Sequence, residues 1–392
     1  MEKIVIIAAS RTAMGSFQGS FSTLSAPDLG AVVIQNVVEQ ANIPLDDIDE
    51  VIMGCVLPAG VKQGPARQAM RQAGLPDHVG ATTINKVCGS GMKAAMQASD
   101  AIKAGSAKII VIGGMESMTN APYLLPKARS GYRMGHGQVI DHMFMDGLED
   151  AGTGRAMGSF AQDMADKKGY SREQMDEFAI RSLTRAQKAI AEGYFKNEIT
   201  AVKVTTRKGE VTIDVDENPA NAKIDKIPTL RAAFAKDGTI TAANSSSISD
   251  GASALLITSE SEANKRNLAV LAEIKGYTTN SQLPEEFTIA PVGAIEKLLK
   301  NVGWSAEDVD LWEINEAFAM VTMAAIDAFK LDPEKVNVNG GACALGHPLG
   351  SSGSRIIVTL IHALKRLGKS KGVAALCIGG GEATAIAIEV KA

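Results

Sequence analysis

A series of short motifs occurs twice along the 392-residue chain, in the same order, and limits the possible folds more than any other feature. Residues 46–54, DDIDEVIMG, are similar to residues 307–315, EDVDLWEIN. Gly91, at the start of an expected helix, matches Gly353, and the stretch IIVIGGME after the first helix matches ALCIGGGE after the second. Each match is weak alone, but the separation stays nearly constant. We therefore predict two related halves.

Within the first half, short β-rich runs alternate with stretches of helical periodicity. The expected strands are Lys3 to Ala9, Val51 to Val56 and Lys108 to Ile112, and the expected helices are Asp28 to Ala41, Gln63 to Gly74 and Met92 to Ala104. Residues 271–392 repeat this architecture. Such alternation predicts an α/β protein in which helices are layered on a largely parallel sheet.

A segment of different character separates the halves. Within it, residues 171–192 have the pattern of a long amphipathic helix opened by a capping sequence, Ser-Arg-Glu-Gln, and residues 198–215 have that of a hairpin turning at Lys208-Gly209. We predict three parts. These are an N-terminal half (1–114 and 244–270), an inserted loop domain (115–243) and a C-terminal half (271–392).

Composition excludes several functional classes. A formal net charge of −4 gives no electrostatic argument for nucleic acid or an anionic membrane. The four cysteines form no CxxC or zinc spacing, which favours a reducing compartment without a disulfide framework. The apolar runs are shorter than the roughly 18 residues that span a bilayer. Because a strand is expected from residue 3 onward, we expect no targeting segment and a cytoplasmic location.

Cys88 is the first candidate for chemistry, because it lies in a Gly-Ser-Gly turn directly before an expected helix. Unpaired N–H groups and the helix dipole favour a thiolate there, and the thiolate is the nucleophilic form. Gly89 and Gly91 would let the backbone turn sharply and let a substrate approach. A buried, inert structural cysteine is the alternative interpretation.

His347 lies at the glycine-rich strand-to-helix junction GHPLGSSG, which the repeat matches with the Cys88 turn. Pro348 favours an extended backbone at His347. A hydrogen-bonded structural histidine is the alternative. The remaining histidines, His78, His136, His142 and His362, are interpreted as structural or loop residues.

Three further polar or glycine positions follow apolar strands. Cys377 is near the end of a buried strand, where α/β proteins place their sites. Residues 379–381 are glycines whose N–H groups could bind an oxyanion, although a phosphate loop is an alternative without a matching motif. Asn315 in WEINEAFA is too polar for a plain core strand, and capping the next helix is its alternative role.

Taken in order, these motifs resemble the thiolase family over the full chain. The matching motifs are VCGSG around Cys88, GGMESM at 113–118, NEAF at 315–318, NGGACALGHPLGSSG at 339–353 and CIGGG at 377–381. Within the family, the short-chain acetyl-CoA acetyltransferases are the most similar kind. The resemblance implies a thiolase-like fold of two similar βαβαβαββ halves in α-β-α-β-α layers, with an inserted loop domain. It also implies a homotetramer built from two dimers.

The resemblance also implies roles for the candidate residues. Cys88 would be the nucleophile that takes the acetyl group, His347 the base that activates it, and Cys377 the acid/base for the α-proton. Asn315 would hold a water and form one oxyanion site with His347, while the N–H groups of Cys88 and Gly379 would form the second. Preorganised donors are needed, because an enolate next to a thioester carries developing charge.

For the substrate, the resemblance implies CoA thioesters and no resident cofactor, and the departure at Asn221 given below leads us to predict no metal. Positions matching the pantetheine channel are Leu148, Met157, Phe234, Ser246, Ala317 and Phe318. Phe287 begins FTIAP, which resembles thiolases that accept 2-methylacetoacetyl-CoA. The chain departs from the family at Ala156 instead of histidine, at Pro219 or its neighbours instead of an arginine, and at Asn221 instead of a potassium-binding tyrosine.

The resulting hypothesis is reversible condensation of two acetyl-CoA to acetoacetyl-CoA and CoA, with no nucleic-acid or membrane partner. A 3-ketoacyl-CoA thiolase of broader chain length, in fatty-acid or branched-chain degradation, is the alternative. A decarboxylating ketoacyl synthase would not need Cys377, and a non-catalytic acyl-CoA-binding protein would have lost one of Cys88, His347 and Cys377. Reaction direction, chain-length preference and pathway stay open.

Overall fold

Ten strands form one continuous mixed sheet in the computed structural model, which describes residues 2–391. The strand order is β12-β13-β14-β11-β1-β10-β5-β3-β4, and the short β2 pairs with β10. The strands are β1 (Ile4–Arg11), β2 (Gly15–Ser16), β3 (Glu50–Gly54), β4 (Gly80–Ile84), β5 (Ile109–Ser117), β10 (Ser249–Ser259), β11 (Ala272–Ser281), β12 (Leu311–Ile314), β13 (Lys371–Ile378) and β14 (Glu382–Val390).

The sheet itself confirms the two related halves. They meet where β1 pairs antiparallel with β11, Ile4 opposite Ile274. Outward from this pair, the first half continues β10-β5-β3 and the second half continues β14-β13-β12. In both halves the third and fourth strands run parallel to each other. The order and sense of the strands are therefore repeated about the β1–β11 pair.

The prediction of a largely parallel sheet was wrong. Among the strands of residues 2–391, parallel pairing is confined to β3–β4, β3–β5 and β12–β13. β13 and β14 are joined by the tight turn at residues 379–381, and a direct turn can join only antiparallel strands. In the first half, β10 returns antiparallel to β5 after the inserted segment.

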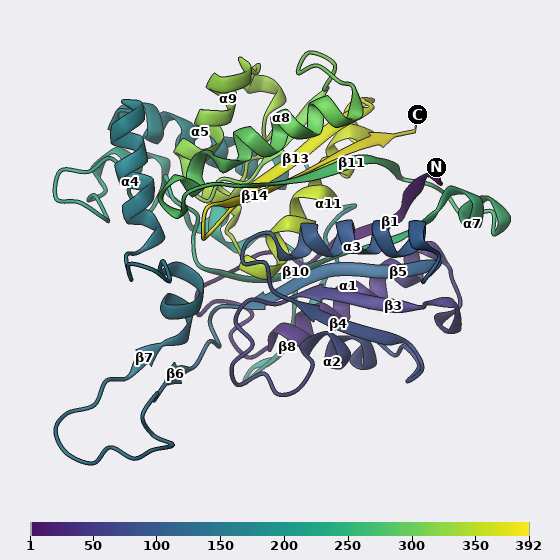
Figure 1. Ribbon diagram of the computed structural model, residues 1–392, viewed down its shortest axis with the longest axis horizontal. Helices are drawn as coiled ribbons and strands as arrows, with labels where there is room; N and C mark the ends of the chain where they lie inside the picture. Colours follow the sequence, from purple (N-terminus) through teal and green to yellow (C-terminus); the bar gives the residue numbers. More distant parts are fainter. Residues whose placement is uncertain (1, 392) are drawn as a thin grey trace.

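Five layers of helix and sheet are visible in Figure 1, and they confirm the predicted α-β-α-β-α arrangement. Helices α8 and α9 cover the β11–β14 part of the sheet, α3 and α11 lie between the two parts, and α1 and α2 cover the β1–β5 part. Aliphatic clusters fill the spaces between layers. The helices of the two halves are α1 (Ala26–Ala41), α2 (Pro65–Gln72), α3 (Ser90–Ala104), α7 (Glu260–Lys265), α8 (Ala290–Val302), α9 (Ala319–Phe329), α10 (Ala342–Leu345) and α11 (Leu349–Leu367).

The two central helices approach each other through matched glycines. A Cβ on Gly91 of α3 would lie 2.7 Å from the backbone nitrogen of Ser354, and one on Gly353 of α11 would lie 2.4 Å from that of Met92. A Cβ on Gly89 would meet Ile378 Cδ1 at 2.3 Å. These glycines allow the two halves to pack together at their backbones. This corrects the prediction that Gly89 and Gly91 serve the turn and the substrate, because their φ angles are not positive and protein atoms occupy the space beside them.

Residues 118–248 connect the neighbouring strands β5 and β10 and form the inserted part. The predicted helix is α5, whose N-cap Ser171 forms a capping box with Gln174, and the predicted hairpin is β8–β9. An arm built on β6 and β7 extends away from the body (Figure 1). The elements are β6 (Tyr123–Leu124), β7 (Ile140–Asp141), α4 (Met157–Lys168), α5 (Arg172–Ala191), β8 (Val202–Thr206), β9 (Gly209–Ile213) and α6 (Glu217–Asn221). We keep the three-part division of the chain as a proposal.

Short 3-10 or π-helical turns complete the chain at Leu45–Asp47, Phe144–Leu148, Ile224–Thr229, Pro284–Ile289 and Pro333–Lys335. Within residues 2–391, every helix is too short or too polar to cross a bilayer.

Candidate active site

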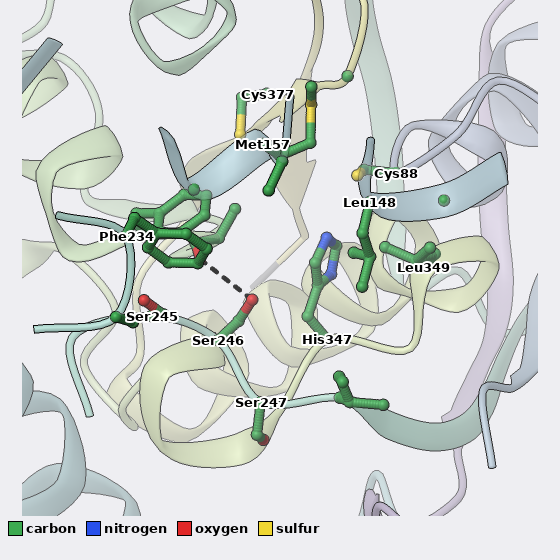
Figure 2. A pocket seen from close by; sticks show the side chains of 18 of the residues that line it. Cys88, Leu148, Met157, Phe234, Ser245, Ser246, Ser247, His347, Leu349 and Cys377 are labelled. Atoms are coloured by element: carbon green, nitrogen blue, oxygen red, sulfur yellow. Dashed lines mark hydrogen bonds between the residues drawn. The ribbon is translucent and has the colours of Figure 1, made fainter. Parts of the chain in front are cut away.

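A cavity of about 410 Å³ lies where both halves and the inserted part meet. Figure 2 shows Cys88, His347 and Cys377 pointing into the same space. The predicted residues that line it are Cys88, Leu148, Met157, Phe234, Ser246, Phe287, Ala317, Phe318, His347, Cys377 and Gly379. Asn315 is not part of this lining and is buried at the end of β12. Residues from three distant parts of the sequence therefore share one cavity.

The turn that presents Cys88 is held in a strained conformation. Val87 has φ 47°, a region that β-branched residues rarely adopt. Its N–H donates to Asn85 Oδ1 at 2.8 Å, and its carbonyl accepts from Ser90 Oγ at 2.7 Å. Ser90 Oγ also accepts from the N–H of Lys86 at 2.8 Å. The sequence analysis missed these hydrogen bonds. The available signal was a serine and an asparagine close to the cysteine on either side.

The prediction of a resting thiolate at Cys88 was wrong. Burial raises the pKa of Cys88 to about 11, although the backbone N–H groups of Gly379 and of Cys88 itself lower it. Two N–H groups do not offset the cost of placing a charge among apolar walls. Cys88 is therefore a neutral thiol at rest, and a base must remove its proton.

His347 is arranged to be that base. Its Nδ1 lies 2.5 Å from Ser352 Oγ, and the Ser352 hydroxyl donates its hydrogen to the carbonyl of Pro348 at 2.9 Å. Because that hydrogen is committed, Ser352 must accept from Nδ1–H, which leaves Nε2 unprotonated. Nε2 is buried and has no hydrogen-bond partner within residues 2–391. Burial and then the charge of Arg355 lower the pKa of His347 to about 3, so the imidazole is neutral.

Ser352 is a functional residue that sequence reasoning missed. It lies in the first turns of α11, five residues after His347, within the same GHPLGSSG motif. The sequence did contain a signal for this role. Ser352 is a hydroxyl residue about one and a half helical turns after His347, in the helix that begins just after that histidine. A partner for the second ring nitrogen is expected at any histidine that must keep one tautomer.

Cys377 and Gly379 lie on the opposite wall, at the end of β13 and in the turn after it. Cys377 is 1% exposed, and burial, followed by its proximity to Cys88, raises its pKa well above the ordinary value. It is therefore a neutral thiol that can donate a proton. Gly380 and Gly381 have φ of 90° and 88°, so only glycine suits this turn. The turn brings the Gly379 N–H to the Cys88 sulfur.

Asn315 and Glu316 have different surroundings. Both amide atoms of Asn315 are buried without a hydrogen-bond partner within residues 2–391, so the amide has capacity for a water. Capping is not its role, because α9 has Phe318 at its N-cap and no side-chain cap bond. Glu316 accepts from Ser182 Oγ at 2.7 Å and Asn337 Nδ2 at 2.8 Å, so its role is structural.

The rest of the cavity is an apolar channel. Phe318 makes edge-to-face contacts with Phe234 and Phe287, each with ring centroids 6.3 Å apart. Phe234 lies over Gly158, where a Cβ would meet the ring at 2.1 Å. Ser246 donates through its N–H and Oγ to the Ala317 carbonyl, as the dashed line in Figure 2 indicates for Oγ. These contacts fit a ligand with a long, uncharged stem.

Comparisons with known proteins agree with this geometry. Residues 4–261 match the family model "Thiolase, N-terminal domain" and residues 268–390 match "Thiolase, C-terminal domain". The chain is 50% identical over 391 residues to the acetyl-CoA acetyltransferase of Escherichia coli, covering 99% of each chain. It is 48% identical over 390 residues to that of Pseudomonas aeruginosa, also covering 99% of each.

Two solved structures superimpose over the whole chain. The acetyl-CoA acetyltransferase of Bacillus anthracis has a TM-score of 0.97 at 41% identity, covering 100% of this chain and 99% of that one. The Acat5 thiolase of Ascaris suum, solved in complex with coenzyme A, has a TM-score of 0.94 at 42% identity, covering 100% of both chains.

Proposed function

Because this chain belongs to the thiolase family and is an acyltransferase, we propose that it is an acetyl-CoA C-acetyltransferase. In this proposal it reversibly condenses two acetyl-CoA molecules to acetoacetyl-CoA and CoA through an acetyl-Cys88 intermediate. The observation that carries the proposal is the convergence of Cys88, Cys377 and the unprotonated Nε2 of His347 on one cavity. Cys88→Ser tests it below.

The first half-reaction uses the neutral Cys88–His347 pair. His347 Nε2 takes the Cys88 proton while the sulfur attacks the thioester carbonyl, and the backbone N–H groups of Cys88 and Gly379 stabilise the oxyanion. The C–S bond to CoA then breaks. The departing CoA thiolate takes the Cys377 proton, which leaves acetyl-Cys88, a Cys377 thiolate and a protonated His347. The high pKa of Cys377 makes its thiolate a strong base for the next step.

The second half-reaction forms the carbon–carbon bond. The Cys377 thiolate removes the α-proton of a second acetyl-CoA, and the enolate oxygen is stabilised by His347 Nε2–H and a water on Asn315. The enolate carbon attacks the acetyl carbonyl, and the bond to Cys88 sulfur breaks. Cys88 takes back the proton of His347, so all three groups return to their resting states.

The substrates of the proposal are CoA thioesters, and no resident cofactor takes part in either step. The apolar channel suits a pantetheine stem, and the Ascaris suum thiolase was solved with coenzyme A. Named relatives are acetyl-CoA acetyltransferases from several organisms. These observations support acetyl-CoA as the substrate.

A broader 3-ketoacyl-CoA thiolase is a second candidate, because a larger cavity adjoins the first. This cavity of about 760 Å³ shares Met157, Gly147 and Gly379 with the 410 Å³ cavity. Its lining combines apolar residues such as Val87 and Phe160 with charged ones, which are Asp146, Glu149, Asp150, Arg155, Asp163 and Glu285. A longer or 2-methyl-branched acyl group could reach it past Met157. Thiolysis rates with acetoacetyl-CoA, 2-methylacetoacetyl-CoA and a C8 3-ketoacyl-CoA separate the two candidates, since only the second predicts comparable C8 turnover.

We also propose a homotetramer, a dimer of dimers, in the cytoplasm. The arm on β6 and β7 leaves Met134 98% exposed and Tyr123 66% exposed, which supports burial of these side chains by other subunits. All four cysteines are free, which supports a reducing compartment.

The decisive test is Cys88→Ser with labelled acetyl-CoA. A serine hydroxyl is a weaker nucleophile and acid, so acetylation of the protein and both directions of turnover should fall by at least about 10³-fold. Mass spectrometry of the intact protein measures the acetyl adduct, and the melting temperature controls for folding. Normal acetylation of the variant would show that another residue is the nucleophile.

A further inference from the structure

Two glutamates occupy matching places in the internal repeat. Glu116 ends the stretch IIVIGGME in β5, and Glu382 ends the stretch ALCIGGGE at the start of β14. Neither side chain lines the 410 Å³ cavity. Each nevertheless contacts the turn that carries the reactive residue of the opposite half.

Glu116 reaches the turn that carries His347. Its carboxylate is fully buried, and Oε2 accepts from the N–H of Gly350 at 2.8 Å and from that of Val56 at 3.0 Å. Oε1 accepts from the N–H of Leu57 at 3.0 Å. Gly350 is in the first turn of α11, three residues after His347, and this helix has no side-chain cap of its own. A carboxylate from the first half therefore holds the N-terminus of the second-half helix.

Glu382 reaches the turn that carries Cys88. Its Oε2 lies 2.6 Å from the ammonium of Lys86, two residues before Cys88, and its Oε1 accepts from Ser281 Oγ at 3.0 Å. The side chains of Lys86 and Glu382 are 20% and 33% exposed, so this ion pair is only partly shielded from water. A carboxylate from the second half therefore holds the turn of the first-half nucleophile.

We propose that Glu116 and Glu382 are a repeat-related pair of positioning residues, which together fix the separation of Cys88 and His347. This inference rests on the proposed roles of those two residues. Each half of the protein supplies one reactive group and one carboxylate, and each carboxylate holds the other half's reactive turn. Proton transfer between Cys88 and His347 requires hydrogen-bond reach, so a displacement of either turn slows turnover without loss of the binding channel.

Three glutamate-to-glutamine variants test the proposal. At Glu116 the amide offers one acceptor oxygen in place of two, so its NH₂ must face at least one backbone N–H, and the α11 turn keeps at best an uncharged, weaker acceptor. We expect kcat to fall about tenfold or more with KM within about twofold. Alkylation of Cys88 by iodoacetamide should slow in parallel, although loss of the Glu116 charge by itself lowers the pKa of Cys88. At Glu382 the partly exposed ion pair weakens, and the same two rates should fall by about three- to tenfold.

Glu389→Gln is the matched control. Glu389 lies on the same strand β14, its side chain is also 33% exposed, and its partner Lys275 is 3.1 Å away. Its kcat and alkylation rate should match those of the wild type. Peptide mass spectrometry follows Cys88 alone, at a temperature well below each melting temperature. If Glu116→Gln does not fold, Glu382→Gln against Glu389→Gln decides the question.

The proposal is overturned if the folded Glu116 and Glu382 variants keep both rates within about twofold of wild type, or if Glu389→Gln loses as much. The proposal is also overturned if KM rises in these variants by the same factor by which kcat falls, because that result indicates a general loss of order in the site, including the binding channel. The proposed function fails by a different result. It is contradicted if the Cys88→Ser variant remains active.

Discussion

Burial, rather than a neighbouring charge, sets the protonation of the reactive groups. Cys88 and Cys377 are held as thiols and His347 as a neutral imidazole, because each is enclosed by apolar walls. A site that is neutral at rest avoids a buried, unpaired charge between turnovers. In the proposed mechanism, charge appears only when the thioester carbonyl arrives at the Gly379 and Cys88 N–H groups, which can then stabilise an oxyanion.

The low pKa of His347 predicts a specific acid sensitivity. The ordinary histidine pKa of 6.5 falls to about 3 in the folded protein, so the unfolded chain binds one more proton between these values. The contribution of His347 to stability is complete above pH 6.5 and is lost as the pH falls toward 3, by about 1.4 kcal/mol per unit. Relative to wild type, the free energy of unfolding of His347→Gln should thus fall by about 2 kcal/mol less between pH 6.5 and 4.5. Urea unfolding at fixed protein concentration measures this, and parallel acid losses would contradict it.

Cys377→Ala should separate the two thiols. The variant should still accept an acetyl group on Cys88, although more slowly, because the nucleophile, base and N–H donors are intact and protonated His347 can give its proton to the departing CoA in place of Cys377. Condensation should fall by about 10² to 10⁴, because no group removes the α-proton of the second acetyl-CoA. Stability should change by only about 1–2 kcal/mol, the cost of a small cavity. The acetyl adduct, the condensation rate and the melting temperature of the variant are measured together.

A condensation rate near that of the wild type would remove Cys377 from the mechanism. A folded variant that cannot be acetylated would show that Cys377 helps to activate Cys88.

At the scale of elements, the sequence predicted best those features that depend only on residues close together in the chain. The capping box at Ser171 and the hairpin depend on neighbouring residues. Both predictions were confirmed, with the hairpin turn one residue earlier than predicted, at Arg207-Lys208. The sense of the strands depends on which segments pair after long connections, and the parallel prediction failed there. Likewise, Cys88 was recognisable by its turn, but its pKa depends on walls contributed by distant segments.

Gly353→Ala should disturb the contact between the two central helices. Its Cβ would lie 2.4 Å from the backbone nitrogen of Met92, so α3 and α11 must separate. We expect a loss of about 1–3 kcal/mol from overpacking and a lower kcat, because both reactive turns precede these helices. Gly80→Ala is the control, since its nearest neighbours lie at 3.6 Å and its φ is ordinary. Urea unfolding and initial rates measure both variants, and equal behaviour of the two would contradict the expectation.

At the scale of the whole molecule, the repeat brings complementary groups together at one place. The proposed nucleophile comes from the turn before α3 and the proposed base from the turn before α11, and these helices meet at Gly91 and Gly353. The inserted part then contributes the channel residues Leu148, Met157 and Phe234. Neither half contains a complete site. The internal similarity in the sequence predicted this pairing, whereas the arm could not be located because its segment carries no strong periodicity.

Shortening that arm tests the proposed tetramer. Residues 125–139 are all exposed, and Leu125, Met134 and Val139 are 51%, 98% and 63% exposed. A single chain gives these side chains no packing partner, so we expect other subunits to cover them. Replacing residues 126–138 by Gly-Gly should keep the β6–β7 pairing at Leu124 and Ile140 and leave the fold intact. Light scattering should then show dimers in place of tetramers. The melting temperature of the variant should change little, because the fold of each subunit is kept.

As a control, Met134→Ala removes one apolar side chain from the expected contact and should only weaken the tetramer. A wild-type protein that scatters only as a 41.0 kDa species at micromolar concentration would reject the tetramer, and an unchanged mass after the deletion would place the contact elsewhere.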